Sequence, residues 1–149
     1  MSLVAQFEAA IQRRIEATMI IAGEIVATEI RDSINRAPRG GKTYQRLNQS
    51  GSYRTVKASA PGEAPATDLG FLVRSIQIEP DLQNLRVRIL SLHSIAPYAK
   101  RLEYGDLSRG LQPRPFMFKG LQAKKQVAIA IVQNAVNQAV RDMQGVPPI

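Results

Sequence analysis

Apolar side chains recur at helical spacing near the start of the chain. Between residues 3 and 36, charged residues fall mostly opposite a stripe formed by Phe7, Ile11, Ile15, Ala22 and Val26. Ser2 is a typical N-cap residue, and Pro38 cannot continue a helix. The pattern predicts one helix of about 33 residues, or ~50 Å at 1.5 Å per residue. Such a helix is longer than a small domain is wide. Either it kinks near Gly23, or one end projects beyond its own core and packs on a neighbouring subunit.

A second helical pattern occupies the end of the chain, within residues 113–145. Its apolar stripe consists of Met117, Leu121, Ala128, Val132, Ala135, Ala139 and Met143. Gly145 and the prolines at 147 and 148 stop the pattern. We therefore expect a C-terminal helix there.

Between these helices, residues 71–112 change to a period of two. The stretch "LVRSIQIEP" alternates from Leu72, and "LRVRILSL" alternates from Leu85 after the turn "PDLQN". This predicts an antiparallel hairpin with one buried face. The following "APYAKRLEYG" (96–105) predicts a short helix that Gly105 ends.

Residues 37–70, "APRGGKTYQRLNQSGSYRTVKASAPGEAPATDLG", have no clear periodicity. Only "SYRTVKA" (52–58) favours a short strand, and Pro61 with Pro65 excludes a helix or a central strand from 58–70. An irregular stretch of this length is typical of a functional loop. We predict an extended arm or a bound loop. The element order predicts one α+β domain over residues 1–149. Its long N-terminal helix and its C-terminal helix pack on a small antiparallel sheet, with a long extended loop.

The net charge of +8 is concentrated in two segments. Residues 37–57 hold five basic side chains and no acidic one, and residues 113–149 hold five basic side chains and one acidic one. A solvated basic face and contact with a polyanion are both compatible with this asymmetry. Aromatic residues make up only 5% of the chain, which disfavours a base-stacking platform.

The composition also narrows the chemistry. The chain contains no cysteine, which excludes a disulfide framework and a cysteine-based zinc site. His93 is the only histidine, and the carboxylates are scattered without metal-ligand spacing. We expect no enzyme activity, no cofactor and no metal. The apolar runs are too short for a signal peptide or a membrane span, so we expect a soluble, intracellular protein without membrane contact.

Four stretches read together resemble a known family. "GGKTYQR", "YRTVKASAPGEAPATDLGFLVRSI", "APYAKRLEYG" and "RPFMFKGL" follow the order of elements in the HK-ninety-seven gene-product-ten-like family of long-tailed bacteriophages. The matching positions are Gly41, Tyr44, Ser59, Pro61, Gly62, Pro65, Asp68, Gly70, Leu72, Ser75, Tyr98, Glu103, Gly105, Arg114, Pro115 and Phe116. Asp106 stands where the family usually has Thr, Ala64 where Pro is common, and Arg101 near a usual aromatic residue or Val.

This resemblance implies a structural virion protein. Members are neck proteins, also called tail completion or head–tail joining proteins, and form a ring through which the genome passes. The resemblance therefore implies a homo-oligomer located in the virion neck, and in the host cytoplasm during assembly, with adjacent neck and tail proteins and passing double-stranded DNA as partners. We predict subunit contacts through Ser59, Pro61, Gly62, Pro65, Asp68, Tyr98, Glu103, Arg114 and Phe116. We predict that the side chains facing the DNA channel are Arg39, Lys42, Arg46, Arg54 and Lys57.

The sequence also leaves other functions open. A tail terminator or minor tail protein has similar ring geometry and α+β layers. A sequence-independent DNA-binding protein would also account for the charge. The basic segment 37–57 suits the acidic surface of a neighbouring protein as well as DNA.

Overall fold

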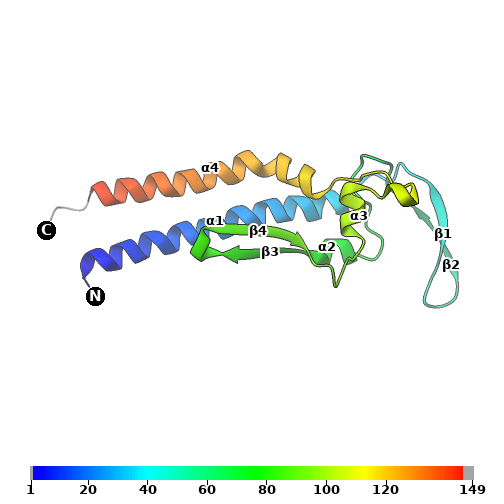
Figure 1. Ribbon diagram of the computed structural model, residues 1–149, viewed down its shortest axis with the longest axis horizontal. Coiled ribbons are helices and arrows are strands. Elements are labelled where there is room, and N and C mark those ends of the chain that lie inside the picture. The colour runs from blue at the N-terminus through cyan, green and yellow to red at the C-terminus, as the bar shows by residue number, and fades with distance from the viewer. Residues whose placement is uncertain (1, 146–149) are drawn as a thin grey trace.

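The computed structural model describes residues 2–145 and has an elongated α+β architecture (Figure 1). Helix α1 (Leu3–Asn35) lies between helix α4 (Met117–Gln144), which runs antiparallel to it, and a hairpin of strands β3 (Ile76–Asp81) and β4 (Arg86–Ser91). A second hairpin, β1 (Thr43–Leu47) and β2 (Tyr53–Lys57), projects from the end of the molecule opposite the start of α1 and the end of α4. The predicted fold class is confirmed.

Helix α1 is continuous through Gly23 and has the length that the sequence predicts, 33 residues. The Ser2 hydroxyl accepts a hydrogen bond from the Ala5 amide (3.2 Å) and caps its first turn. Its buried apolar residues, including Val26, Ile30 and Ile34, lie in its C-terminal half. A Cβ added to Gly23 would lie 2.5 Å from Val87 Cγ1, so this glycine allows β4 to pack closely on the helix.

The core is a single cluster where α1, α4 and the middle segments meet. It consists of Val26, Ala27, Ile30, Ile34, Leu72, Ile76, Ala96, Ala99 and Phe116. Short helix α3 (Ala99–Tyr104) contributes Ala99 to this cluster and ends at Gly105, which has a φ of 79°. The predicted short helix is confirmed. None of the helices in the described part of the chain has an apolar stretch long enough to cross a lipid bilayer.

Helix α4 occupies the predicted range, but its predicted inward stripe is only partly correct. Ala139 is buried, and Met117, Ala128, Val132 and Ala135 are half-buried. Leu121 and Met143 are instead 43% and 55% exposed. At Gly120 the two helices pack closely, because an added Cβ would lie 2.3 Å from Ile30 Cγ1. The contact with α1 thus uses small residues, and several large apolar ones face outward.

The β3–β4 hairpin starts later than the sequence pattern indicates. Residues 71–75, predicted as strand, form one short helix, α2 (Phe71–Ser75), and β3 begins at Ile76. Leu72 and Ile76 are four residues apart, a spacing that puts both on one face of a helix or of a strand, so the pattern alone does not separate the two. The Ser75 hydroxyl donates to the Leu72 carbonyl (2.7 Å), which closes this turn. The rest of the hairpin is confirmed, with Ile78 opposite Ile89.

Residues 37–70 are not uniformly irregular, which corrects the prediction of a long extended loop. The strand predicted over 52–58 is present as β2, and β1 pairs with it in antiparallel register, with Thr43 opposite Lys57 and Leu47 opposite Tyr53. All five residues of β1 are exposed. A strand without a buried face has no apolar alternation, so periodicity could not reveal it. Residues 37–42 before this hairpin and residues 58–70 after it (here called the strap) are mostly irregular.

Candidate interaction site

The strap is bound to its own chain just before α4. The Gly62 amide donates to the Pro113 carbonyl (3.1 Å), and the Arg114 guanidinium donates to the Ser59 carbonyl from Nε (3.3 Å) and Nη2 (3.2 Å). Lys119 donates to the Gly62 carbonyl. The alternative of a bound loop, rather than a projecting arm, therefore describes the single chain.

The strap also closes against the segment that leads into β1. The Glu63 carboxylate accepts hydrogen bonds from the amides of Gly40 (3.2 Å) and Ala60 (2.6 Å). A Cβ added to Gly41 would lie 2.3 Å from the Ser59 carbonyl oxygen, so only glycine fits there. Sequence reasoning identified Gly41 but missed Glu63, because its partners are backbone amides that leave no pattern in the sequence.

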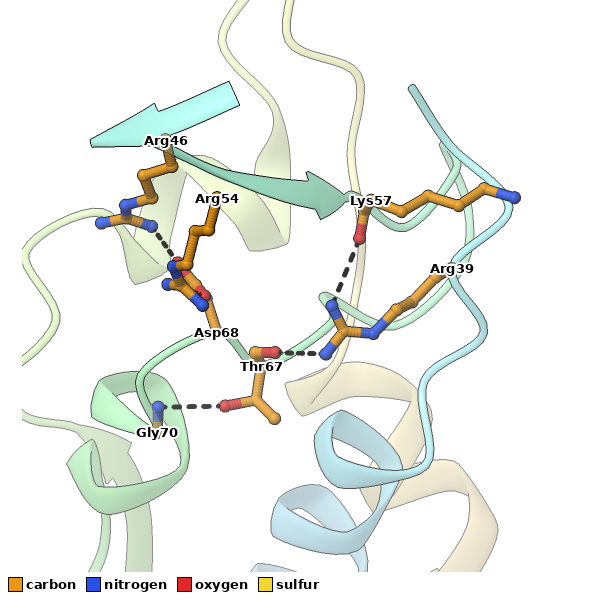
Figure 2. A network of polar contacts seen from close by, with 7 residues as sticks. All are labelled: Arg39, Arg46, Arg54, Lys57, Thr67, Asp68 and Gly70. Carbon is orange, nitrogen blue, oxygen red and sulfur yellow. Dashed lines mark hydrogen bonds and ion pairs between the residues drawn. The ribbon is translucent and has the colours of Figure 1, made fainter. Parts of the chain in front are cut away.

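Three of the five basic residues predicted to face DNA are engaged within this site (Figure 2). Arg39 donates to the carbonyls of Lys57 (3.4 Å) and Thr67 (2.8 Å). Arg46 and Arg54 both form ion pairs with Asp68, one on each carboxylate oxygen. Among the described residues, the ammonium groups of Lys42 and Lys57 have neither a hydrogen bond nor an ion pair, so their charges face solvent.

Asp68 joins the strap to the β1–β2 hairpin. Arg46 and Arg54 are directly opposite in the register, and like charges in that position repel. The shared carboxylate offsets this repulsion. The Asp68 side chain is only 17% exposed, whereas those of Arg46 and Arg54 are 47% and 36% exposed. The three side chains thus lie at the surface, and the Asp68 side chain is the least exposed of them.

Tyr98 belongs to the same neighbourhood. Partial burial raises the pKa of its phenol above the ordinary value of 10.0, and the Asp68 carboxylate adds to this, while the Arg46 guanidinium acts in the opposite direction. Tyr98 is 41% exposed, so it remains available for an outside contact.

Glu103, predicted as a contact between subunits, has a role inside the chain. Its carboxylate accepts hydrogen bonds from the amides of Phe116 (2.8 Å), Met117 (3.0 Å) and Phe118 (3.0 Å), at the start of α4. These amides have no partner within the helix, and the N-terminus favours a negative charge. Phe116 is 1% exposed and belongs to the core.

The predicted contact residues therefore fall into two groups. Ser59, Pro65 and Phe116 are buried by their own chain, and Asp68, Glu103 and Arg114 are held by internal polar contacts. Pro61, Gly62 and Tyr98 are exposed. For the first group, this geometry assigns an internal role; contact with another subunit stays a prediction for all of them.

The turn after Glu103 is stiffened around Asp106. The Asp106 carboxylate accepts a hydrogen bond from the Ser108 hydroxyl (2.5 Å) and lies near Arg101 (3.6 Å) and Arg109 (3.5 Å). The Ser108 hydrogen bond and the two arginines hold the pKa of Asp106 below its ordinary value of 3.8 despite some desolvation. Leu107 at the tip of the turn is 97% exposed.

A shallow apolar groove lies between α4 and β4, over the middle of α1. Helix α1 forms its floor, and α4 and β4 form its walls, with a volume of about 510 Å³. Its lining consists of Met19, Ala22, Gly23, Val26, Val87, Ile89, Leu121, Ala128, Ile129, Val132 and Gln133. The lining contains no charged side chain, so the groove suits an apolar occupant.

The outward apolar face of α4 continues this groove along the helix. At 100° per residue, one stripe contains Phe118, Leu121, Ile129, Val136, Val140 and Met143, here called the α4 stripe, and the exposed Lys125 interrupts it between Leu121 and Ile129. Each of the apolar side chains in the stripe is between 39% and 58% exposed. This second stripe lies beside the small-residue face that packs on α1.

The described residues contain no group of three or more His, Asp or Glu side chains arranged to hold a metal ion.

Comparisons of the chain with known protein families, with curated proteins and with solved structures gave no match.

Proposed function

We propose that this chain is a structural subunit of a long-tailed phage virion, which forms the ring that joins head and tail and through which DNA passes. The sequence elements that resemble the neck family support this assignment. The observation that carries it is the α4 stripe together with its groove, because a single copy leaves this apolar surface uncovered.

The length of the exposed α4 stripe is what calls for neighbours. Monomeric soluble proteins rarely expose a contiguous apolar patch larger than a few hundred Å². The α4 stripe extends from residue 118 to residue 143, which is ~38 Å of helix at 1.5 Å per residue. A copy of the same chain is the occupant that a closed ring provides, and contact between two different surfaces of one chain generates a ring when the rotation closes.

The β1–β2 hairpin, at the end of the molecule away from the C-terminal end of α4, supplies projecting surface (Figure 1). On the β1–β2 hairpin, Tyr44, Leu47 and Tyr53 are 45%, 58% and 73% exposed. A two-stranded hairpin is only marginally stable by itself in water. We infer that the hairpin, rather than the strap, reaches the neighbouring surface, since internal bonds already hold the strap. This revises the contact set that the sequence suggested.

A freely acting DNA-binding protein is the weaker proposal. Arg39, Arg46 and Arg54 have partners within the chain, which leaves Lys42 and Lys57 as the basic side chains of the 37–57 segment without one. Two such cations predict a weak interaction with DNA, with a shallow salt slope of about −1.8 for each chain. That suits a channel through which DNA must slide.

The proposal is tested by electron microscopy of particles assembled with and without this chain. We expect DNA-filled heads beside finished, unattached tails when the chain is missing, and joined particles when it is restored. Normally joined particles in its absence would refute the assignment. Missing tails would instead favour a tail terminator or minor tail protein.

A further inference from the structure

We propose that Asp68 masks a phosphate-binding pair formed by Arg46 and Arg54, so that the carboxylate occupies the place of a DNA phosphodiester. This inference rests on the proposed passage of DNA and adds a regulated site to it. It concerns the duplex backbone and not base sequence.

The geometry of the pair carries the argument. Each Asp68 oxygen receives one guanidinium, from two arginines that stand opposite each other on β1 and β2 (Figure 2). A phosphodiester also spreads one negative charge over two equivalent oxygens, and arginine recognises carboxylate and phosphate with the same planar fork. The pair is therefore shaped for either anion.

The surroundings favour a polyanion over a single ion. Lys42 and Lys57 lie on or beside the same hairpin with their charges in solvent. Asp68 is tethered to the same chain, which gives it a high effective concentration against any single phosphate. A duplex that also reaches both lysines gains several contacts at once and competes better.

The mask gives the site a function suited to a channel. With Asp68 in place the two arginines and the carboxylate carry a net charge of +1, so they attract DNA less than two free arginines would, and the duplex slides. When the hairpin and the strap separate, the same arginines become available to hold it. The strap is thus the element that sets how strongly the hairpin attracts DNA.

The test is fluorescence anisotropy with a short mixed-sequence duplex between about 50 and 200 mM salt. We expect Asp68→Asn to bind about 3- to 10-fold more tightly at low salt. The slope of log affinity against log salt should steepen by about 0.9, because the pair takes one phosphate and each phosphate contact contributes about 0.9. Adding Arg46→Gln and Arg54→Gln to Asp68→Asn should return the slope to the wild-type value or below it.

Glu79→Gln is the matched control. It also removes one negative charge and releases one cross-strand arginine, Arg88, but on the β3–β4 hairpin. Its slope should stay at the wild-type value. An equal gain in both variants would mean that net charge alone acts, and would overturn the proposal.

A second comparison does not depend on the folding of Asp68→Asn. In the presence of Asp68, Arg46→Gln with Arg54→Gln should lower the salt slope less than Lys42→Gln with Lys57→Gln does, because the shared carboxylate already offsets one of the two arginine charges, whereas both lysine charges face solvent. An equal fall in both double variants would show that the arginines already contact DNA, and would overturn the mask. A gain of Asp68→Asn for poly-glutamate but not for DNA would overturn it in favour of an acidic protein surface. None of these failures affects the head–tail joining test, which depends only on particle morphology.

Discussion

The cap that Glu103 places on α4 leads to the sharpest prediction for stability. Glu103→Ala removes the acceptor of three backbone hydrogen bonds, at 2.8, 3.0 and 3.0 Å, and leaves the amides of the first turn of a 28-residue helix without it. A lost helix cap costs about 0.5–2 kcal/mol, and hydrogen bonds to a charged group contribute about 1.5–3 kcal/mol each. The hydrogen bond at Phe118 is exposed to water, whereas those at Phe116 and Met117 are partly buried. We therefore expect a loss of about 2–4 kcal/mol in the free energy of unfolding.

The assay is urea unfolding followed by circular dichroism at two protein concentrations, so that association is separated from stability. Glu103→Gln keeps one acceptor oxygen without the charge and should lose about half as much. A loss below about 0.5 kcal/mol for Glu103→Ala, the level of an ordinary surface substitution, would refute the capping role. A loss seen only as weaker association would return Glu103 to the predicted subunit contact.

Three further predictions concern the helix contact, the groove and Tyr98. Gly120→Ala should destabilise the chain by about 1–3 kcal/mol in urea unfolding, because the new methyl group would lie 2.3 Å from Ile30 Cγ1, whereas Gly145→Ala, with no neighbouring atom closer than 3.7 Å, should be nearly neutral. Ile129→Asp should weaken self-association in sedimentation equilibrium about ten-fold or more, while Val127→Asp, equally exposed but outside the α4 stripe, should not; equal effects would refute the groove as the contact. The raised pKa of Tyr98 contributes stability that is fully present below the ordinary value of 10.0 and is lost as pH rises through the higher folded value. Tyr98→Phe should remove that part of the alkaline loss in a pH series of unfolding curves, and an unchanged alkaline loss would contradict this.

The elements that the sequence predicted correctly are those whose burial is periodic. Helix α1 buries one face, and β4 alternates exposed and half-buried residues over its first four positions, so the order of apolar residues reports their conformation directly. Strand β1 buries no face, and its residues carry no such signal. The prediction of a strand over residues 71–75 is wrong because Leu72 and Ile76 fit the period of a helix as well as that of a strand.

The site was less accessible because its contacts are distant along the chain. Asp68 and Arg46 are 22 residues apart, and Glu103 and Phe116 are 13 apart. Neither spacing falls within one helix face or one hairpin, so a single sequence could suggest these residues only through resemblance. The resemblance selected Asp68, Glu103 and Arg114. Their partners show that these residues connect the strap, the β1–β2 hairpin and the start of α4.

The central claim is most directly tested by a reconstruction of the head–tail junction in particles that contain this chain. The account predicts a closed ring of copies around the DNA path, with the apolar groove between α4 and β4 covered by the next copy and the β1–β2 hairpin at a subunit boundary. A junction without this chain, or with copies whose grooves remain open to solvent, would contradict it.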